Sequence, residues 1–320
     1  MRILLMLTMV LSSLTAQTDF NKVGTAGLLF LSIPGSASAQ AMGRAYSGIE
    51  QGAEATFFNP ALLGFEHSTQ VFTSYTGWLQ GLSHQSAAIS FRVGRFGVGI
   101  SQMLLTCSPM TVTTTQQPQG TGETFGYLDL ALGFSVSRAF SDRFSLGGTV
   151  KYIYEGVQSI SAHGFGVDIG SFYWIGYNDL RIFMVLQNFG PEMSFGGSFF
   201  DTRVKGNIRE DVELRYAAIP LPITFTMGVA GTVWKQGERG LLLAVEANHP
   251  ADYSQRMNIG AEFNLTHSLF LRGGYKINYE QESWSAGCGF KIGRFKSDLA
   301  YVPMKKFTDV LSYSINYILK

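Results

Sequence analysis

Apolar and polar residues alternate along most of this chain. In residues 143–156, RFSLGGTVKYIYEG, every second position from Phe144 onward is aromatic, aliphatic or glycine, and polar residues such as Lys151 and Glu155 fill the positions between. Ile153 is the one apolar residue on the polar side. Successive side chains of a β-strand point to opposite faces of its sheet, so this period of two predicts a strand with one apolar and one polar face.

The same alternation recurs in about fourteen segments that are bounded by turn residues. The predicted strands are 70–76, 85–92, 95–105, 124–138, 143–156, 164–175, 180–188, 222–235, 239–248, 255–265, 268–276, 283–292, 295–301 and 310–319. Their connections switch strictly between short links, such as 93–94, and longer stretches, the longest of which is 189–221. A β-barrel that crosses an outer membrane has short turns on one side and long loops on the other. A soluble β-sandwich or β-solenoid is the alternative, but it does not need loops that alternate in length.

The composition fits a membrane barrel. The chain is 46% apolar and only 15% charged, which leaves few charged residues to cover a soluble globule of 320 residues. Beyond the N-terminus no run of about 18 consecutive apolar residues occurs, which argues against helical membrane spans. Charges of both signs lie on the polar faces of the predicted strands, so they can pair across neighbouring strands or line a conducting lumen; we favour the pairing.

The N-terminus has the features of a secretory signal peptide. Arg2 supplies a positive charge, residues 3–11 are apolar, and Leu14-Thr15-Ala16 forms a small-residue cleavage site. No cysteine follows this site to carry a lipid anchor. We therefore predict a signal peptide at 1–16, a segment at 17–69 that precedes the barrel, and the barrel at 70–320. The predicted location is the outer membrane of a bacterium, which the chain crosses many times and whose lipid surrounds it.

The segment 17–69, here called the plug, is too irregular for membrane strands. Small residues dominate between Ser36 and Gly64, and they let backbone pack closely against a barrel wall, as in a segment tucked into a lumen. Asn59-Pro60 has the form of a cap followed by the first position of a short helix. An apolar cluster upstream needs a wall to bury it, or forms contacts with a hydrophobic ligand: Leu28, Leu29, Phe30, Leu31 and Ile33.

Three short motifs in the plug resemble the N-terminal signature of a known family. They are Gly24-Thr25-Ala26 followed by Phe30-Leu31, then Ala41-Met42-Gly43-Arg44-Ala45, then Phe58-Asn59-Pro60-Ala61-Leu62. This signature is that of the PorV/PorQ family, within the FadL-like group of fourteen-stranded outer-membrane barrels, and the resemblance continues through residues 84–101. The motif residues that it assigns to the plug are Ala41, Met42, Gly43, Ala45, Asn59, Pro60 and Ala61. The resemblance implies an all-β membrane protein, a transmembrane antiparallel barrel of about fourteen strands with an N-terminal lumen plug. It also implies a component of the type IX secretion system that binds cargo or attachment partners.

Enzymatic chemistry has little support in the sequence. The five histidines are dispersed mostly through predicted loops without metal-ligand spacing, and no nucleophile elbow or phosphate-binding loop occurs. We predict no catalytic residue, no metal and no cofactor. The net charge of +1, without a basic stripe, gives no support for nucleic-acid binding. Cys107 and Cys288 are far apart in the chain and are predicted to be unpaired.

Two functions remain open. The connection 189–221 is the leading candidate for a partner-binding surface, because loops this long in compact proteins are usually functional or disordered. Its candidate contact residues are Phe195, Phe199, Phe200, Arg203, Lys205 and Arg209. The first function is a barrel that docks a secretion-system or surface protein there. The second is a FadL-like transporter in which the plug binds a fatty-acid-like molecule.

Overall fold

The computed structural model describes residues 23–49, 52–158, 160–205 and 208–319, and the side chains of 199–212 lie outside this description. The signal peptide predicted for residues 1–16 also lies outside the described residues. Among the described residues, no helix combines the length and the apolar character needed to cross a membrane; this finding says nothing about a β-barrel.

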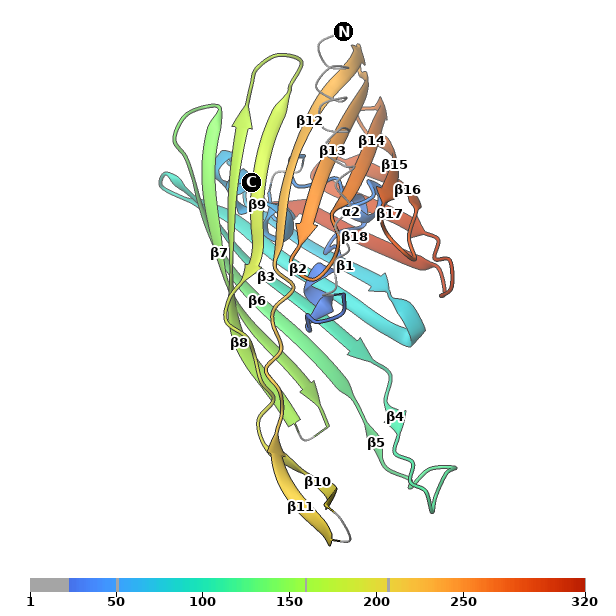
Figure 1. Cartoon of the computed structure of the whole chain (residues 1–320). Helices are drawn as coiled ribbons and strands as arrows, with labels where there is room; N and C mark the ends of the chain where they lie inside the picture. The colour runs from blue at the N-terminus through green and yellow to red at the C-terminus, as the bar shows by residue number, and fades with distance from the viewer. Residues whose placement is uncertain (1–22, 50–51, 159, 206–207, 320) are drawn as a thin grey trace.

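Fourteen strands form one closed antiparallel barrel (Figure 1). They are β1 (Gln70–Gly77), β2 (Leu82–Val93), β3 (Phe96–Cys107), β6 (Tyr127–Ala139), β7 (Phe144–Val157), β8 (Ile160–Trp174), β9 (Arg181–Phe189), β12 (Thr224–Gln236), β13 (Arg239–Pro250), β14 (Arg256–Thr266), β15 (Leu269–Ile277), β16 (Trp284–Ile292), β17 (Phe295–Val302) and β18 (Val310–Ile318). The barrel closes where β1 pairs with β18 in continuous register from Gln70↔Ile318 to Gly77↔Leu311. The predicted fold class is thereby confirmed.

Most predicted strand ends differ from the structure by one or two residues, and a few differ by more. β2 begins at Leu82, three residues before its predicted start, and β8 begins at Ile160, four residues before its predicted start. Because β7 ends at Val157, the connection from β7 to β8 is short, which breaks the predicted strict alternation of short and long connections.

The segment predicted as one strand over 124–138 is divided at Gly126 into the short β5 (Thr124–Phe125) and the wall strand β6. The segment predicted from residue 222 onward enters the barrel only at Thr224. Pro222 lies outside the ladder because proline has no backbone N–H to donate to a neighbouring strand.

The two faces of the strands follow the alternation in the sequence. In β6, Leu132 and Phe134 are exposed on the outer face, whereas Asp129 and Ser135 are buried on the inner face. This outward apolar face is the surface that a barrel presents to lipid. Ile153, the apolar exception on an inner face, is fully buried in the apolar cluster that packs against the plug. The exception in the pattern therefore marks a wall position inside an apolar cluster, which the plug and the connection after β9 share.

The connections divide the barrel into two ends. At the turn end, strands are joined by tight turns, and Gly94, Gly237 and Gly293 occupy the left-handed region there with φ of 59°, 60° and 59°. At the loop end lie the long connections, and two of them fold into hairpins. The connection after β3 contains β4 (Met110–Thr111) and β5, and the connection after β9 contains β10 (Ser198–Lys205) and β11 (Ile208–Arg215). Both hairpins extend beyond the rim of the barrel, at the bottom of Figure 1.

This arrangement predicts which positions are reached from outside a cell. With Cys107 and Cys288 replaced by serine, a cysteine at Ser198 on the loop end is expected to react with a membrane-impermeant maleimide on intact cells. Cysteines at Ser141 and His267, in turns at the opposite end, are expected to react only after the outer membrane is permeabilised. Equal labelling of both classes on intact cells would show that the barrel orientation is wrong.

The plug lies inside the barrel, where Figure 1 shows the blue segment crossing the lumen. Its described elements are η2 (Leu29–Ser32), α2 (Ala37–Ala41), α3 (Ala55–Phe58) and η3 (Pro60–Phe65); a further turn, η4 (Leu79–Gly81), belongs to the connection after β1. Asn59 caps η3 as predicted, because its Oδ1 accepts a hydrogen bond from the Ala61 N–H at 3.0 Å and Pro60 takes the first helical position.

Candidate functional site

The wall is built to receive the plug at close range. A Cβ on Gly274 of β15 would lie 2.1 Å from the backbone N of Gly43, and one on Gly97 of β3 would lie 1.9 Å from the Leu63 carbonyl oxygen. Gly43 has φ of 63°. Glycine is therefore required on both sides of the contact with β15, so that two backbones can meet.

All seven motif residues that the sequence assigned to the plug are buried in the structure. They are Ala41, Met42, Gly43, Ala45, Asn59, Pro60 and Ala61. The first four seat α2 and the turn after it against the wall near Gly260, Gly274 and Gly287, and the last three hold η3 against β7 and β8. The Asn59 side chain links the parts, since its Nδ2 donates to the carbonyl oxygens of Ser47 at 3.1 Å and Ser171 at 3.3 Å.

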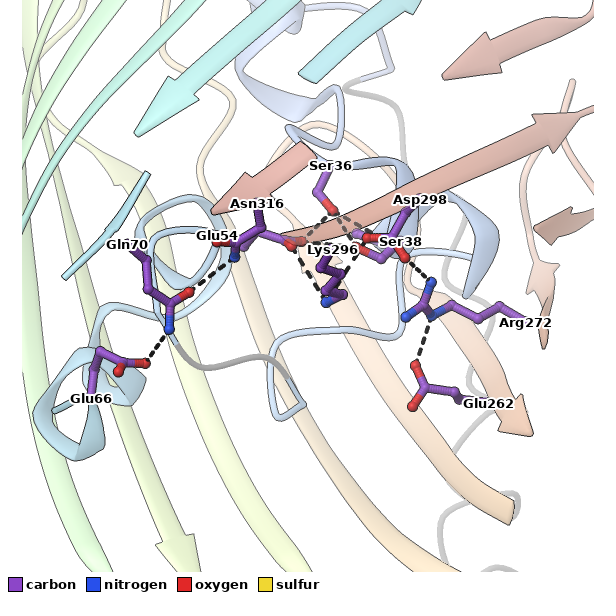
Figure 2. A network of polar contacts seen from close by, with 11 residues as sticks. Ser36, Ser38, Glu54, Glu66, Gln70, Glu262, Arg272, Lys296, Asp298 and Asn316 are labelled. Atoms are coloured by element: carbon purple, nitrogen blue, oxygen red, sulfur yellow. Dashed lines mark hydrogen bonds and ion pairs between the residues drawn. The ribbon is translucent and has the colours of Figure 1, made fainter. Parts of the chain in front are cut away.

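A buried polar network fixes the plug to the wall (Figure 2). The carboxylate of Glu54 accepts hydrogen bonds from Ser36 Oγ at 2.6 Å and Ser38 Oγ at 2.8 Å, so it joins two distant stretches of the plug. Its other oxygen lies 3.6 Å from Lys296 Nζ on β17. A carboxylate without solvent needs such partners, and here they tie the plug to the wall.

The same network continues into the wall. Arg272 of β15 pairs with Glu262 on β14 at 2.7 Å and with Asp298 on β17, and Lys296 lies 3.9 Å from Asp298. The pair between Arg272 and Glu262 joins neighbouring strands, as the sequence predicted for the polar faces, whereas Arg272 reaches Asp298 across the intervening β16, over Gly289. At the other side of Figure 2, Asn316 donates to Gln70 at 3.0 Å, across the seam where the barrel closes.

A cavity of about 380 Å³ lies between the plug and the wall at the loop end. One side of it is apolar, and its residues include Leu29, Leu31, Ile33, Phe57, Phe58 and Trp78. Of the apolar cluster predicted in the plug, Leu29, Leu31 and Ile33 thus line the cavity. Leu28 and Phe30 do not; they are buried in the hydrophobic core that η2 forms with the wall. The cluster is thus divided between packing against the wall and lining the cavity.

The opposite side of the cavity is polar and is held by charges and rings. Arg44 of the plug pairs with Glu282 at 3.2 Å, and Lys276 pairs with the same carboxylate. Burial raises the pKa of Glu282, but the positive charges of Arg44 and Lys276 outweigh burial and lower the pKa to about 2. The guanidinium of Arg256 lies over the rings of Tyr253 and Tyr279, at 4.3 and 4.7 Å from their centroids.

The sequence did not identify this polar side. Apart from Arg44 of the plug, its residues lie in or beside the loop-end connections 251–255 and 278–283, where one arginine and two tyrosines are too ordinary a set to stand out. A weak signal was present, because both connections carry aromatic and charged residues together at the same end of the barrel. In the described part of the chain, no group of three or more histidine, cysteine, aspartate or glutamate side chains is placed to hold a metal ion.

The residues predicted in the connection 189–221 are not all brought together. Phe195 lies before the hairpin: it forms an isolated bridge with Ala162, and its ring meets that of Tyr216 at 6.0 Å. It thereby helps complete the wall beside β8. Phe199, Phe200, Arg203 and Lys205 lie on β10 and Arg209 lies on β11, within the hairpin that extends from the rim.

The closed fourteen-stranded barrel with a plug in its lumen is the architecture of a bacterial outer-membrane β-barrel. Solved structures of this kind are similar to the chain: the Pseudomonas putida toluene transporter TodX (13% identity, 88% of this chain and 97% of that chain covered, TM-score 0.59), a TodX deltaS2S3 mutant described as a monoaromatic hydrocarbon channel (12%, 88% and 98%, 0.60) and a Pseudomonas aeruginosa FadL homologue (12%, 89% and 98%, 0.58). No protein-family model and no curated protein matches the sequence. The chain has the FadL-like and TodX-like fold.

Proposed function

We propose that this protein is an outer-membrane channel that binds and passes hydrophobic small molecules. The observation that carries the proposal is the cavity of about 380 Å³ between the plug and the wall, with apolar side chains of the plug on one side. Small-molecule sites are typically clefts of about 300–1,000 Å³ lined mostly by apolar and aromatic side chains. The similarity to TodX and to the FadL homologue supports the proposal, because two of those structures are described as a toluene transporter and a hydrocarbon channel.

The exposed end of the cavity offers a direct test. Leu29 lines the cavity and is 54% exposed, so aspartate can replace it without burying a charge in the core. With the protein in lipid nanodiscs, the uncharged fluorophore N-phenyl-1-naphthylamine is expected to show tryptophan-sensitised emission above that of empty nanodiscs. Leu29→Asp is expected to weaken this binding by up to about tenfold, because Leu29 is about half exposed and full burial of a leucine is worth about 1.5–3 kcal/mol.

Val23→Asp is the matched control. Val23 is 52% exposed and does not line the cavity, so this variant carries the same added charge on the same segment. Its affinity for the fluorophore is expected to equal that of the wild type. No saturable signal in the wild type, or equal affinity of both variants, would contradict the proposal.

A second candidate function is the docking of a protein partner, which the resemblance to the PorV/PorQ family implies. The observation that favours it is the β10–β11 hairpin, whose strands pair in continuous register from Ser198↔Arg215 to Lys205↔Ile208 and extend beyond the rim. A hairpin outside the barrel forms no part of the wall. Its proposed role is contact with a secretion-system or surface protein. Both proposed functions include the same division of the chain, with a signal peptide at residues 1–16 and the plug at residues 17–69.

Pull-down from native outer membranes separates the two functions. For the docking function, a component of the secretion system is expected to co-purify with the intact chain and to be lost when residues 198–215 are replaced by a short Gly-Ser linker. Recovery of bound lipid-like molecules without any protein partner would contradict docking. Loss of the partner with unchanged fluorophore binding would show that the two sites act independently.

A further inference from the structure

The cavity between the plug and the wall has two sides of different character. Its apolar side is formed mainly by η2 and α3 of the plug, and its polar side by the loop-end residues around Glu282 and Arg256. A ligand that fills it must therefore have an apolar part and a polar part, and the chemistry of the polar side decides which polar group fits.

The charges around the polar side balance one another. The cavity is lined by two arginines, Arg44 and Arg256, and by the carboxylates of Asp252, Glu280 and Glu282; the buried carboxyl of Glu246 is held by hydrogen bonds from the backbone N–H and hydroxyl of Ser47. Lys276, behind the lining, adds one more positive charge through its pair with Glu282. Three positive groups thus face three carboxylates, and a charged head of either sign gains no net attraction.

The positive groups are also engaged already. Arg44 pairs with Glu282 and donates to the carbonyl oxygen of Ser32 at 3.0 Å. Arg256 lies over the rings of Tyr253 and Tyr279. The Arg44 guanidinium is therefore not presented as a free fork for a carboxylate, which is the geometry that anion recognition by arginine uses, and the Arg256 guanidinium is held against two rings.

The polar side has hydrogen-bonding capacity that the described residues do not use. Four lining side chains form no hydrogen bond with another described residue: Arg256 can only donate, Asp252 accepts, and the amides of Asn258 and Gln281 can do both. The polar side therefore contains both donors and acceptors.

We infer that the cavity takes an amphiphile with an uncharged, polyhydroxylated head, a class that includes alkyl glycosides. Each hydroxyl group both donates and accepts a hydrogen bond, so a polyol matches a wall with both kinds of group, whereas a carboxylate only accepts and an ammonium only donates. The apolar chain of the amphiphile lies against Leu31, Ile33 and Phe57, and its head lies between Asp252 and Gln281. This inference rests on the proposed function, because it specifies the ligand of the same cavity.

The test compares the affinities of amphiphiles that have the same eight-carbon chain length but different head groups. In nanodiscs at pH 7.5, octyl β-D-glucoside, octanoate and octyltrimethylammonium compete with N-phenyl-1-naphthylamine, each below its critical micelle concentration and with empty nanodiscs subtracted. The glucoside is expected to displace the fluorophore at a concentration at least tenfold lower than either charged compound. Equal or tighter competition by octanoate would overturn the inference in favour of an anionic head.

A double variant locates the head. In Asp252→Leu/Gln281→Leu, binding of the fluorophore is expected to persist while the advantage of the glucoside over octanoate falls below threefold. Gln255→Leu is the control, because Gln255 lies in the same loop but does not line the cavity. An unchanged advantage in the double variant would overturn the placement of the head. Absence of fluorophore binding in the wild type contradicts the proposed function itself; binding without a preference for the glucoside contradicts only this inference.

Discussion

Gly274→Val is expected to unseat the plug and open an ion-conducting path through the barrel. A Cβ at this position would lie 2.1 Å from the N and 2.4 Å from the Cα of Gly43, and 2.4 Å from the carbonyl carbon of Met42. These are backbone atoms, which cannot turn aside as a flexible side chain can. Overpacking a close contact costs about 1–3 kcal/mol, and moving the plug away from β15 relieves that cost.

Conductance in planar lipid bilayers measures the result. The wild type, whose lumen holds the plug, is expected to show rare openings, and Gly274→Val is expected to show frequent, long-lived conductance steps. Gly273→Val is the control on the same strand: a Cβ there meets only the Ser285 carbonyl oxygen, at 4.0 Å, so the valine is accommodated. If both variants conduct like the wild type, the close contact between Gly274 and Gly43 does not hold the plug in place.

The barrel could be predicted from the sequence because each strand has its own alternation of apolar and polar residues. A residue that faces lipid must be apolar and its neighbour in the strand faces the interior, so the alternation is visible without knowledge of any other strand. Even the exception was informative, since Ile153 lies in the apolar cluster inside the barrel. The hairpin of β10 and β11 was not predicted as a hairpin. Its charged alternation has no membrane face and resembles that of a solvated loop.

The cavity could not be found in the same way. Its lining comes from the plug, from five wall strands and from separate loops, and only closure of the barrel brings Leu31 near Gln281. The apolar run from Leu28 to Ile33 was visible in the sequence. A run of apolar residues does not show which of them line a cavity and which are packed in the core. In η2 the turn geometry makes that division, burying Phe30 in the core and leaving Leu29 at the cavity. The polar side depends on tertiary contacts alone.

Arg272→Met is expected to destabilise the barrel by about 3–5 kcal/mol, the usual cost of removing one partner from a buried ion pair. The Arg272 side chain is 2% exposed, and it neutralises Asp298, whose side chain is 1% exposed, together with Glu262. Methionine has a similar volume, so the loss comes from the two carboxylates that are left without it. Lys296, at 3.9 Å from Asp298, compensates only in part, because it also serves Glu54 of the plug.

Urea unfolding of the protein in lipid vesicles, followed by tryptophan fluorescence, measures this change. Arg294→Met, at the exposed turn between β16 and β17, is expected to change the unfolding free energy by less than about 0.5 kcal/mol. The double variant Arg272→Met/Asp298→Leu is expected to be more stable than the single variant, because it removes the most deeply buried of the carboxylates left uncompensated. A double variant that is less stable than Arg272→Met would mean that Asp298 stabilises the fold through contacts other than this pair, and that the network of Figure 2 is not held together by its charges.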